Sequence, residues 1–191
     1  MEFLDTQQTQ SQLEQIGLVY EDTGEGDDTI LSLKIDDDEE RIVIISAAET
    51  LPPGVDAGAA TVVKDASGLG AAAEKVLGVL HVGEAILIPA KRWRDVLDVA
   101  AFDLATHEEW LDVDSEATLH QNRRDPLAVP PFQKHIVGAL LNACAEHGES
   151  EGSNLFVTTM GSKLVIEAHY EGYLRVHLVS DAVLDTLLAA F

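Results

Sequence analysis

The basic cluster Lys91-Arg92-Trp93-Arg94 stands out in a chain of 34 acidic and 12 basic residues. It opens a segment whose apolar residues recur at helical spacing, so Lys91, Arg92 and Arg94 are placed at a helix N-terminus, where cations oppose the helix dipole. An anion bound by these cations and by backbone amides would explain the misfit. Local compensation is the alternative, because an aspartate follows both Lys91 and Arg94 four residues later.

Three other motifs each lack a necessary part. The stretch from Gly68 to Ala73 fits G-x-G-x-x-A, but no clear βαβ unit follows, and small residues at the start of a helix explain it. His107-Glu108-Glu109 is half of H-E-x-x-H, with leucine where the second zinc ligand belongs. Cys144 lies one helical turn from His147, but on an apolar stripe, so we expect an inert buried thiol. We predict no catalytic residue, metal site or cofactor.

The last three strands have a pairing that the turns define. Strands are predicted at 155–160, 163–169 and 173–179. A two-residue turn and then a three-residue turn with Gly172 in the left-handed region place Ile166 opposite Val176. One face of this meander is then entirely apolar, and two helices are predicted to cover it, one beginning at Pro131 and one capped by Ser180.

The opposite face of the same strands is partly apolar and partly polar. Its candidate partner-binding residues are Phe156, Val165, Glu167, His169, Tyr173, Arg175 and His177. Something should cover its apolar members, since large apolar patches rarely face water. The first half of this chain, a second copy of it, or a foreign partner could do so. His169 and His177 stand on the order of 13 Å apart, too far to share a metal ion.

The first half contains weaker patterns. A helix is predicted at 3–16, strands at 18–21, 29–35 and 41–46, a connector at 50–60, a helix at 70–80, a strand at 84–88 and a helix up to 104. The five acids of 36–40 are interpreted as a hairpin loop between two of the strands. The predicted fold is α+β, with two antiparallel sheet modules flanked by helices. The N-terminal module spans 1–106, a linker 107–130, and a C-terminal α-β-β-β-α module 131–191.

Composition excludes several classes of protein. The chain has 191 residues, of which 46% are hydrophobic, enough to bury a core. Its net charge of −22 repels nucleic acid and anionic lipid. No apolar run approaches the roughly 20 residues that span a bilayer. A single cysteine and the absence of a signal-peptide pattern favour a reducing, cytoplasmic location.

Two functional hypotheses follow. The favoured one is a non-enzymatic protein-binding or adaptor protein that uses the outer sheet face on a protein partner or as a homodimer. The alternative is a protein or enzyme that binds a small anionic ligand through Lys91, Arg92 and Arg94. The order of elements and the acidity resemble those of small acidic chaperones and adaptors, including secretion chaperones, although no shared motif carries this resemblance.

Overall fold

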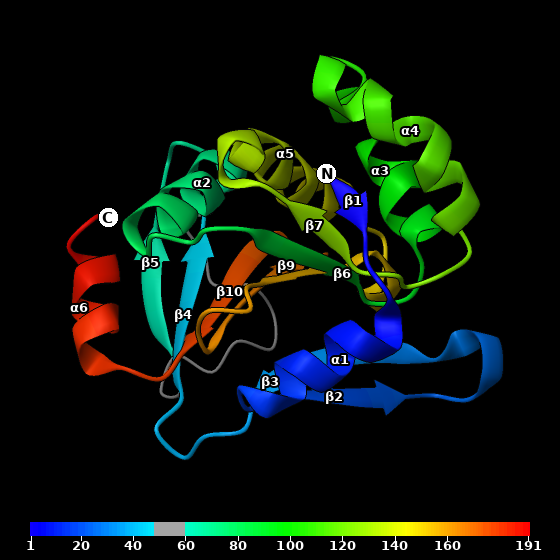
Figure 1. The fold of residues 1–191 in the computed structure, drawn as a ribbon. Helices are drawn as coiled ribbons and strands as arrows, with labels where there is room; N and C mark the ends of the chain where they lie inside the picture. The colour runs from blue at the N-terminus through cyan, green and yellow to red at the C-terminus, as the bar shows by residue number, and fades with distance from the viewer. Residues whose placement is uncertain (48–59) are drawn as a thin grey trace.

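The protein is built in three layers. A computed structural model describes residues 1–47 and 60–191, leaving out the side chains of residue 27 and residues 111–116. In these ranges the strands form one large sheet and one two-stranded hairpin. Helices cover one face of the large sheet, while α1 (Thr6–Gln15) and the hairpin lie against the other (Figure 1). The predicted α+β class is confirmed. Only residue 60 of the predicted connector 50–60 lies within the described residues.

The large sheet interleaves strands from both halves of the chain. Its order is β1 (Glu2–Phe3), β7 (Leu127–Val129), β6 (Ala85–Pro89), β8 (Leu155–Thr158), β9 (Leu164–His169), β10 (Tyr173–Leu178), β4 (Arg41–Ser46) and β5 (Thr61–Lys64). Neighbouring strands are antiparallel except β4 and β5, which are parallel. Two sheets are present, as expected, but the division between them does not follow the two halves of the chain.

The predicted register of the last three strands is confirmed. Ile166 lies opposite Val176, and Val157 lies opposite Ile166. Gly172 adopts the left-handed conformation that the second turn requires, with φ of 89°. The apolar face packs against α2 (Leu69–Val79), α3 (Trp93–Leu104), α5 (Lys134–His147) and α6 (Asp181–Leu188).

The helices α2 and α5 approach closely through two glycines. A Cβ atom on Gly138 would lie 3.0 Å from the Gly70 carbonyl oxygen, and one on Gly70 would lie 3.1 Å from the Gly138 carbonyl oxygen. The Gly70 N–H donates to Asn142 Oδ1 at 3.1 Å. The small residues after Gly68 begin a helix, as interpreted from the sequence, and the structure adds that Gly70 allows this helix to pack closely on α5.

The opposite face of the large sheet is covered by the beginning of the chain. Asp5 caps α1 by accepting a hydrogen bond from the Gln8 N–H at 2.8 Å. Strands β2 (Leu18–Thr23) and β3 (Ile30–Ile35) pair with each other across a loop that contains η1 (Gly26–Asp28). The predicted β3–β4 hairpin across the acids 36–40 is therefore wrong, because β3 pairs with β2 in the small sheet while β4 pairs with β10.

Residues 107–130, which were predicted to be a linker, contain regular structure. They form α4 (Glu108–His120) and β7, and β7 pairs with both β1 and β6. Next, η2 (Pro131–Gln133) forms a 3-10 turn that leaves Phe132 78% exposed. The helix predicted to begin at Pro131 therefore begins only at Lys134, as α5. A further 3-10 turn, η3 (Glu151–Ser153), precedes β8.

Candidate functional site

Lys91 and Arg92, in the turn that joins β6 to α3, line a hollow of about 220 Å³. Arg123 and Arg124, from the turn after α4, line the same hollow together with Asn122. Arg94 is not among the lining residues. Its side chain is exposed and lies 3.8 Å from the Asp98 carboxylate. The structure thus brings together two of the three predicted cations and adds two arginines from the region predicted to be a linker.

Backbone hydrogen bonds tie the two walls of this hollow together. The amide of Trp93 donates to the Arg123 carbonyl at 3.0 Å, and the amide of Arg94 donates to the Gln121 carbonyl at 2.7 Å. The buried Trp93 indole Nε1 donates to the Asp125 carbonyl at 2.7 Å. The sequence had suggested that the first amides of α3 bind an anion. These amides are already occupied by backbone hydrogen bonds and are therefore not free to do so. Recognition here would depend on side chains.

Each cation of the hollow lies near an aspartate. The nearest nitrogen–oxygen distances are 3.0 Å for Lys91–Asp28, 3.6 Å for Arg92–Asp95, 3.8 Å for Arg123–Asp125 and 2.6 Å for Arg124–Asp22. The Lys91 ammonium holds the pKa of Asp28 below its ordinary value through a hydrogen bond. Pairs with an exposed carboxylate, such as Lys91–Asp28, contribute little to stability. They orient the cations, and ligand oxygens could replace their carboxylates at small cost.

The apolar members of the predicted partner-binding face are buried within the chain. Phe156 is 3% exposed and Val165 is fully buried. Both belong to one hydrophobic cluster with Leu13 of α1 and with leucines of the β2–β3 hairpin, including Leu33. The first half of the chain covers these residues, which was one of the three occupants considered.

The polar members of that face form a hydrogen-bonded network. Glu167 lies opposite Arg175, as predicted. Its Oε2 accepts from Arg175 at 2.9 Å, and its Oε1 accepts from Asn154 at 2.9 Å. Arg175 also donates to the Tyr173 hydroxyl at 2.9 Å. Asn154 was missed from the sequence, because it precedes β8 and only the folded sheet brings it to Glu167.

Burial shifts the titration of this network. It raises the pKa of Glu167, and it raises that of the Tyr173 phenol to about 12. His169 stacks on Tyr173 with ring centroids 4.5 Å apart, and burial lowers its pKa to about 4. His177, in another cross-strand row, has Nδ1 2.8 Å from Glu40 Oε1. Because these groups satisfy one another, the network is best suited to holding the strands together.

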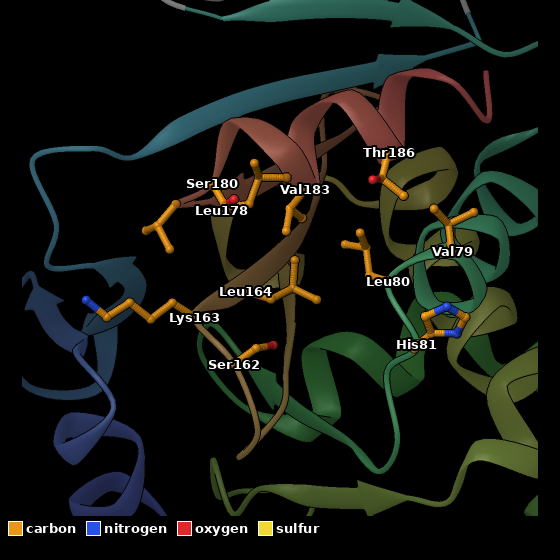
Figure 2. A pocket seen from close by; sticks show the side chains of 11 residues that line it. Val79, Leu80, His81, Ser162, Lys163, Leu164, Leu178, Ser180, Val183 and Thr186 are labelled. Carbon is orange, nitrogen blue, oxygen red and sulfur yellow. The ribbon is translucent and has the colours of Figure 1, made fainter.

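A largely apolar cavity of about 330 Å³ lies beside α6 (Figure 2). It is lined by residues from the end of α2, the turn before β9, the end of β10, and α6, among them Leu80, Leu164 and Val183. His81 also lines the cavity. Its backbone has a φ of 51°, a left-handed conformation that is uncommon for a residue other than glycine. The Lys163 side chain extends away from the other lining groups, and its ammonium lies 2.7 Å from Asp37. The cavity therefore suits an apolar group better than an anion.

The remaining sequence motifs divide into two groups. Cys144 is fully buried, and burial raises its pKa to about 12, so this thiol is not positioned as a nucleophile. His107 and Glu109, by contrast, lie next to His135 at the start of α5, an imidazole that no sequence pattern connected to them.

Comparisons with family models, with curated proteins and with solved structures return no match. Within the described part of the chain, none of the helices combines the length and the apolar character needed to cross a membrane.

Proposed function

We propose that this protein binds a small organic anion in the hollow formed by Lys91, Arg92, Arg123 and Arg124. One observation carries the proposal. In a chain of net charge −22, four of its 12 Lys and Arg residues line a single described hollow. Such a concentration is unexpected on an acidic surface, and it provides the positive charge that an anion requires.

The side chains favour a phosphoryl or carboxylate group as the part of the ligand that is recognised. Arginine presents a planar fork of donors that matches both groups, and Lys91 adds a point charge. The hollow, at about 220 Å³, is smaller than the ~300–1,000 Å³ of drug-sized sites. A small metabolite fits this volume. A nucleic acid does not suit the site, because the negative charge elsewhere would repel a polyanion.

The experiment compares ligand-induced stabilisation in matched variants. The full-length protein is heated with inorganic phosphate, citrate or a sugar phosphate, each against sodium chloride of equal ionic strength. A ligand at 100 times its Kd adds about 2.7 kcal/mol of stability, which raises Tm by about 5–11 °C in a protein of this size. Lys91→Gln and Arg123→Gln should each reduce this shift.

Arg94→Gln is the matched control, because Arg94 belongs to the same sequence cluster but does not line the hollow. It should retain the full shift. Equal loss in Arg94→Gln and Lys91→Gln would show that the anions act through general charge. The absence of any shift across the panel would reject the proposal.

The protein-partner and homodimer hypotheses stay predictions, as does a cytoplasmic location. The apolar outer face that motivated a partner is occupied by α1 and the β2–β3 hairpin. Size-exclusion chromatography with light scattering measures the oligomeric state directly.

A further inference from the structure

Three side chains with metal-binding chemistry meet between the start of α4 and the start of α5. One ligand atom from each of His107, Glu109 and His135 lies within 4.8 Å of the others. His135 Nε2 is 3.5 Å from Glu109 Oε1, and the two imidazole centroids are 5.4 Å apart. His107 and Glu109 belong to the incomplete zinc motif of the sequence, and α5 supplies the second imidazole that the motif lacks.

We propose that His107, Glu109 and His135 bind a divalent transition metal ion of the Zn²⁺ class. Two imidazole nitrogens and one carboxylate form a donor set that zinc prefers. Calcium and magnesium, which prefer oxygen ligands, do not suit it. The imidazoles distinguish this cluster from the many exposed acids, since the chain has seven histidines and 34 acidic residues.

The distances agree with tetrahedral coordination after a small adjustment. With metal–ligand bonds of about 2.1 Å, ligand atoms on a tetrahedron stand about 3.4 Å apart. The His135–Glu109 separation of 3.5 Å already has this value. The widest separation, at most 4.8 Å, has to shorten by about 1.4 Å. Rotation of the exposed Glu109 side chain and of the half-buried imidazoles can supply this change.

Buried neighbours hold the backbone of the three ligands. The His107 N–H donates to the Leu104 carbonyl at 3.0 Å, and the Trp110 N–H donates to the His107 carbonyl at 3.1 Å. Trp110, 4% exposed, packs into the core under the helical layer. On α5, the residue after His135 is the fully buried Ile136. The ligands are thus presented from anchored helix starts, which reduces the entropy lost when a metal binds.

A hollow of about 400 Å³ adjoins the cluster. It is lined by His107 and His135 and also by Glu74, Asp103 and Asn142. Three protein ligands leave one tetrahedral position for water or for an oxygen atom of a bound molecule. The hollow offers space for that fourth ligand, together with carboxylates that can accept hydrogen bonds from a metal-bound water.

The test is calorimetric titration of tag-free, full-length protein with zinc chloride in excess Mg²⁺, which occupies the acidic surface groups. One equivalent of Zn²⁺ should bind. His107→Ala and His135→Ala should each weaken binding by more than about 100-fold, because loss of even an outer-shell partner costs about 10–100-fold. Co²⁺ in place of Zn²⁺ should give the visible absorption of a tetrahedral ion with nitrogen ligands.

His147→Ala is the matched control, since His147 lies at the other end of α5. It should bind Zn²⁺ like the unmodified protein, and so should Lys91→Gln, which separates this site from the anion hollow. Circular dichroism and Tm of the two ligand variants confirm that they are folded. Zn²⁺ binding that is absent, that persists in both His107→Ala and His135→Ala, or that is lost equally in His147→Ala would overturn the proposal.

Discussion

The Glu167 carboxylate makes two hydrogen bonds inside the sheet while burial opposes its charge. Desolvation raises its pKa above the ordinary value of 4.5, and this effect exceeds the opposing attraction of Arg175 and His177. A carboxyl group with a higher pKa in the folded state binds its proton more tightly when folded. Its contribution to stability is therefore present below pH 4.5 and is lost as the pH rises through the folded-state value.

Glu167→Gln should test this sign. The free energy of unfolding of the unmodified protein, minus that of the variant, should decrease as the pH rises above 4.5. Urea denaturation at several pH values measures the difference. Glu84→Gln, at an exposed position, reports the trend that follows from removing any acid from this acidic chain. A difference that stays level, or that grows with pH relative to this control, would contradict the assignment.

Single residues were predictable where a short-range pattern determined them. The Glu167–Arg175 pair followed from the turn lengths together with the requirement that one face of the strands be apolar, and it is confirmed. Arg123, Arg124 and His135 were missed as site residues, since their neighbours come from distant segments. The adjacent pair Arg123-Arg124 in an acidic chain was a visible signal, but residues 107–130 had been interpreted as a linker.

Among the elements, α2 and α5 depend on the absence of side chains at their crossing. Alanine normally stabilises a helix interior by about 1 kcal/mol relative to glycine. At Gly138 the added Cβ would lie 2.9 Å from Glu74 Cγ and 3.0 Å from the Gly70 carbonyl oxygen. Packing should outweigh propensity at this position, because backbone cannot move aside as a flexible side chain can.

Gly138→Ala should therefore destabilise the protein by about 1–3 kcal/mol, the usual cost of overpacking, and lower Tm by about 2–12 °C. Gly78→Ala in α2 is the matched substitution. Its Cβ would meet only the flexible end of Lys134, at 3.4 Å, so it should leave stability unchanged or increase it. Thermal unfolding measures both. Stabilisation by both substitutions would show that the two helices can separate without cost.

The β3–β4 hairpin was wrongly predicted, although the apolar patterns of the two strands differ in a way that the sequence shows. Strand β3 alternates, with Leu31, Leu33 and Ile35 on one face, whereas the run Ile42–Ile45 in β4 is apolar on both faces. A strand that is apolar on both faces belongs inside a covered sheet, and an alternating strand can form a layer above it. The acidic segment 36–40 therefore joins strands of two different layers, and their closeness in sequence does not make them a pair.

At the scale of the whole molecule, neither half of the chain forms the large sheet by itself. Strands β8 to β10 are bordered by β6 on one side and β4 on the other. Their outer face is covered by α1 and the β2–β3 hairpin, both from the first 35 residues. The modular division predicted from the order of elements could not anticipate this, because strand pairing over more than a hundred residues leaves no local pattern.

A fragment of residues 131–191 should consequently fail to fold on its own. It would expose two strand edges and the apolar side chains Phe156 and Val165. Circular dichroism and amide dispersion in NMR spectra would show a disordered or aggregated chain. Adding a fragment of residues 1–130 should restore order. Cooperative thermal unfolding of the isolated fragment would support independent modules instead.

The position of β8 to β10 has a consequence for biosynthesis. Strand β4 leaves the ribosome with only β5 as a sheet partner, and β10 follows roughly 130 residues after the end of β4. At about 5–20 residues per second, β4 remains without its main neighbour for roughly 7–26 seconds. Throughout that interval the nascent chain presents unpaired apolar strands, so its yield in cells should depend on translation speed and on chaperones that hold incomplete chains.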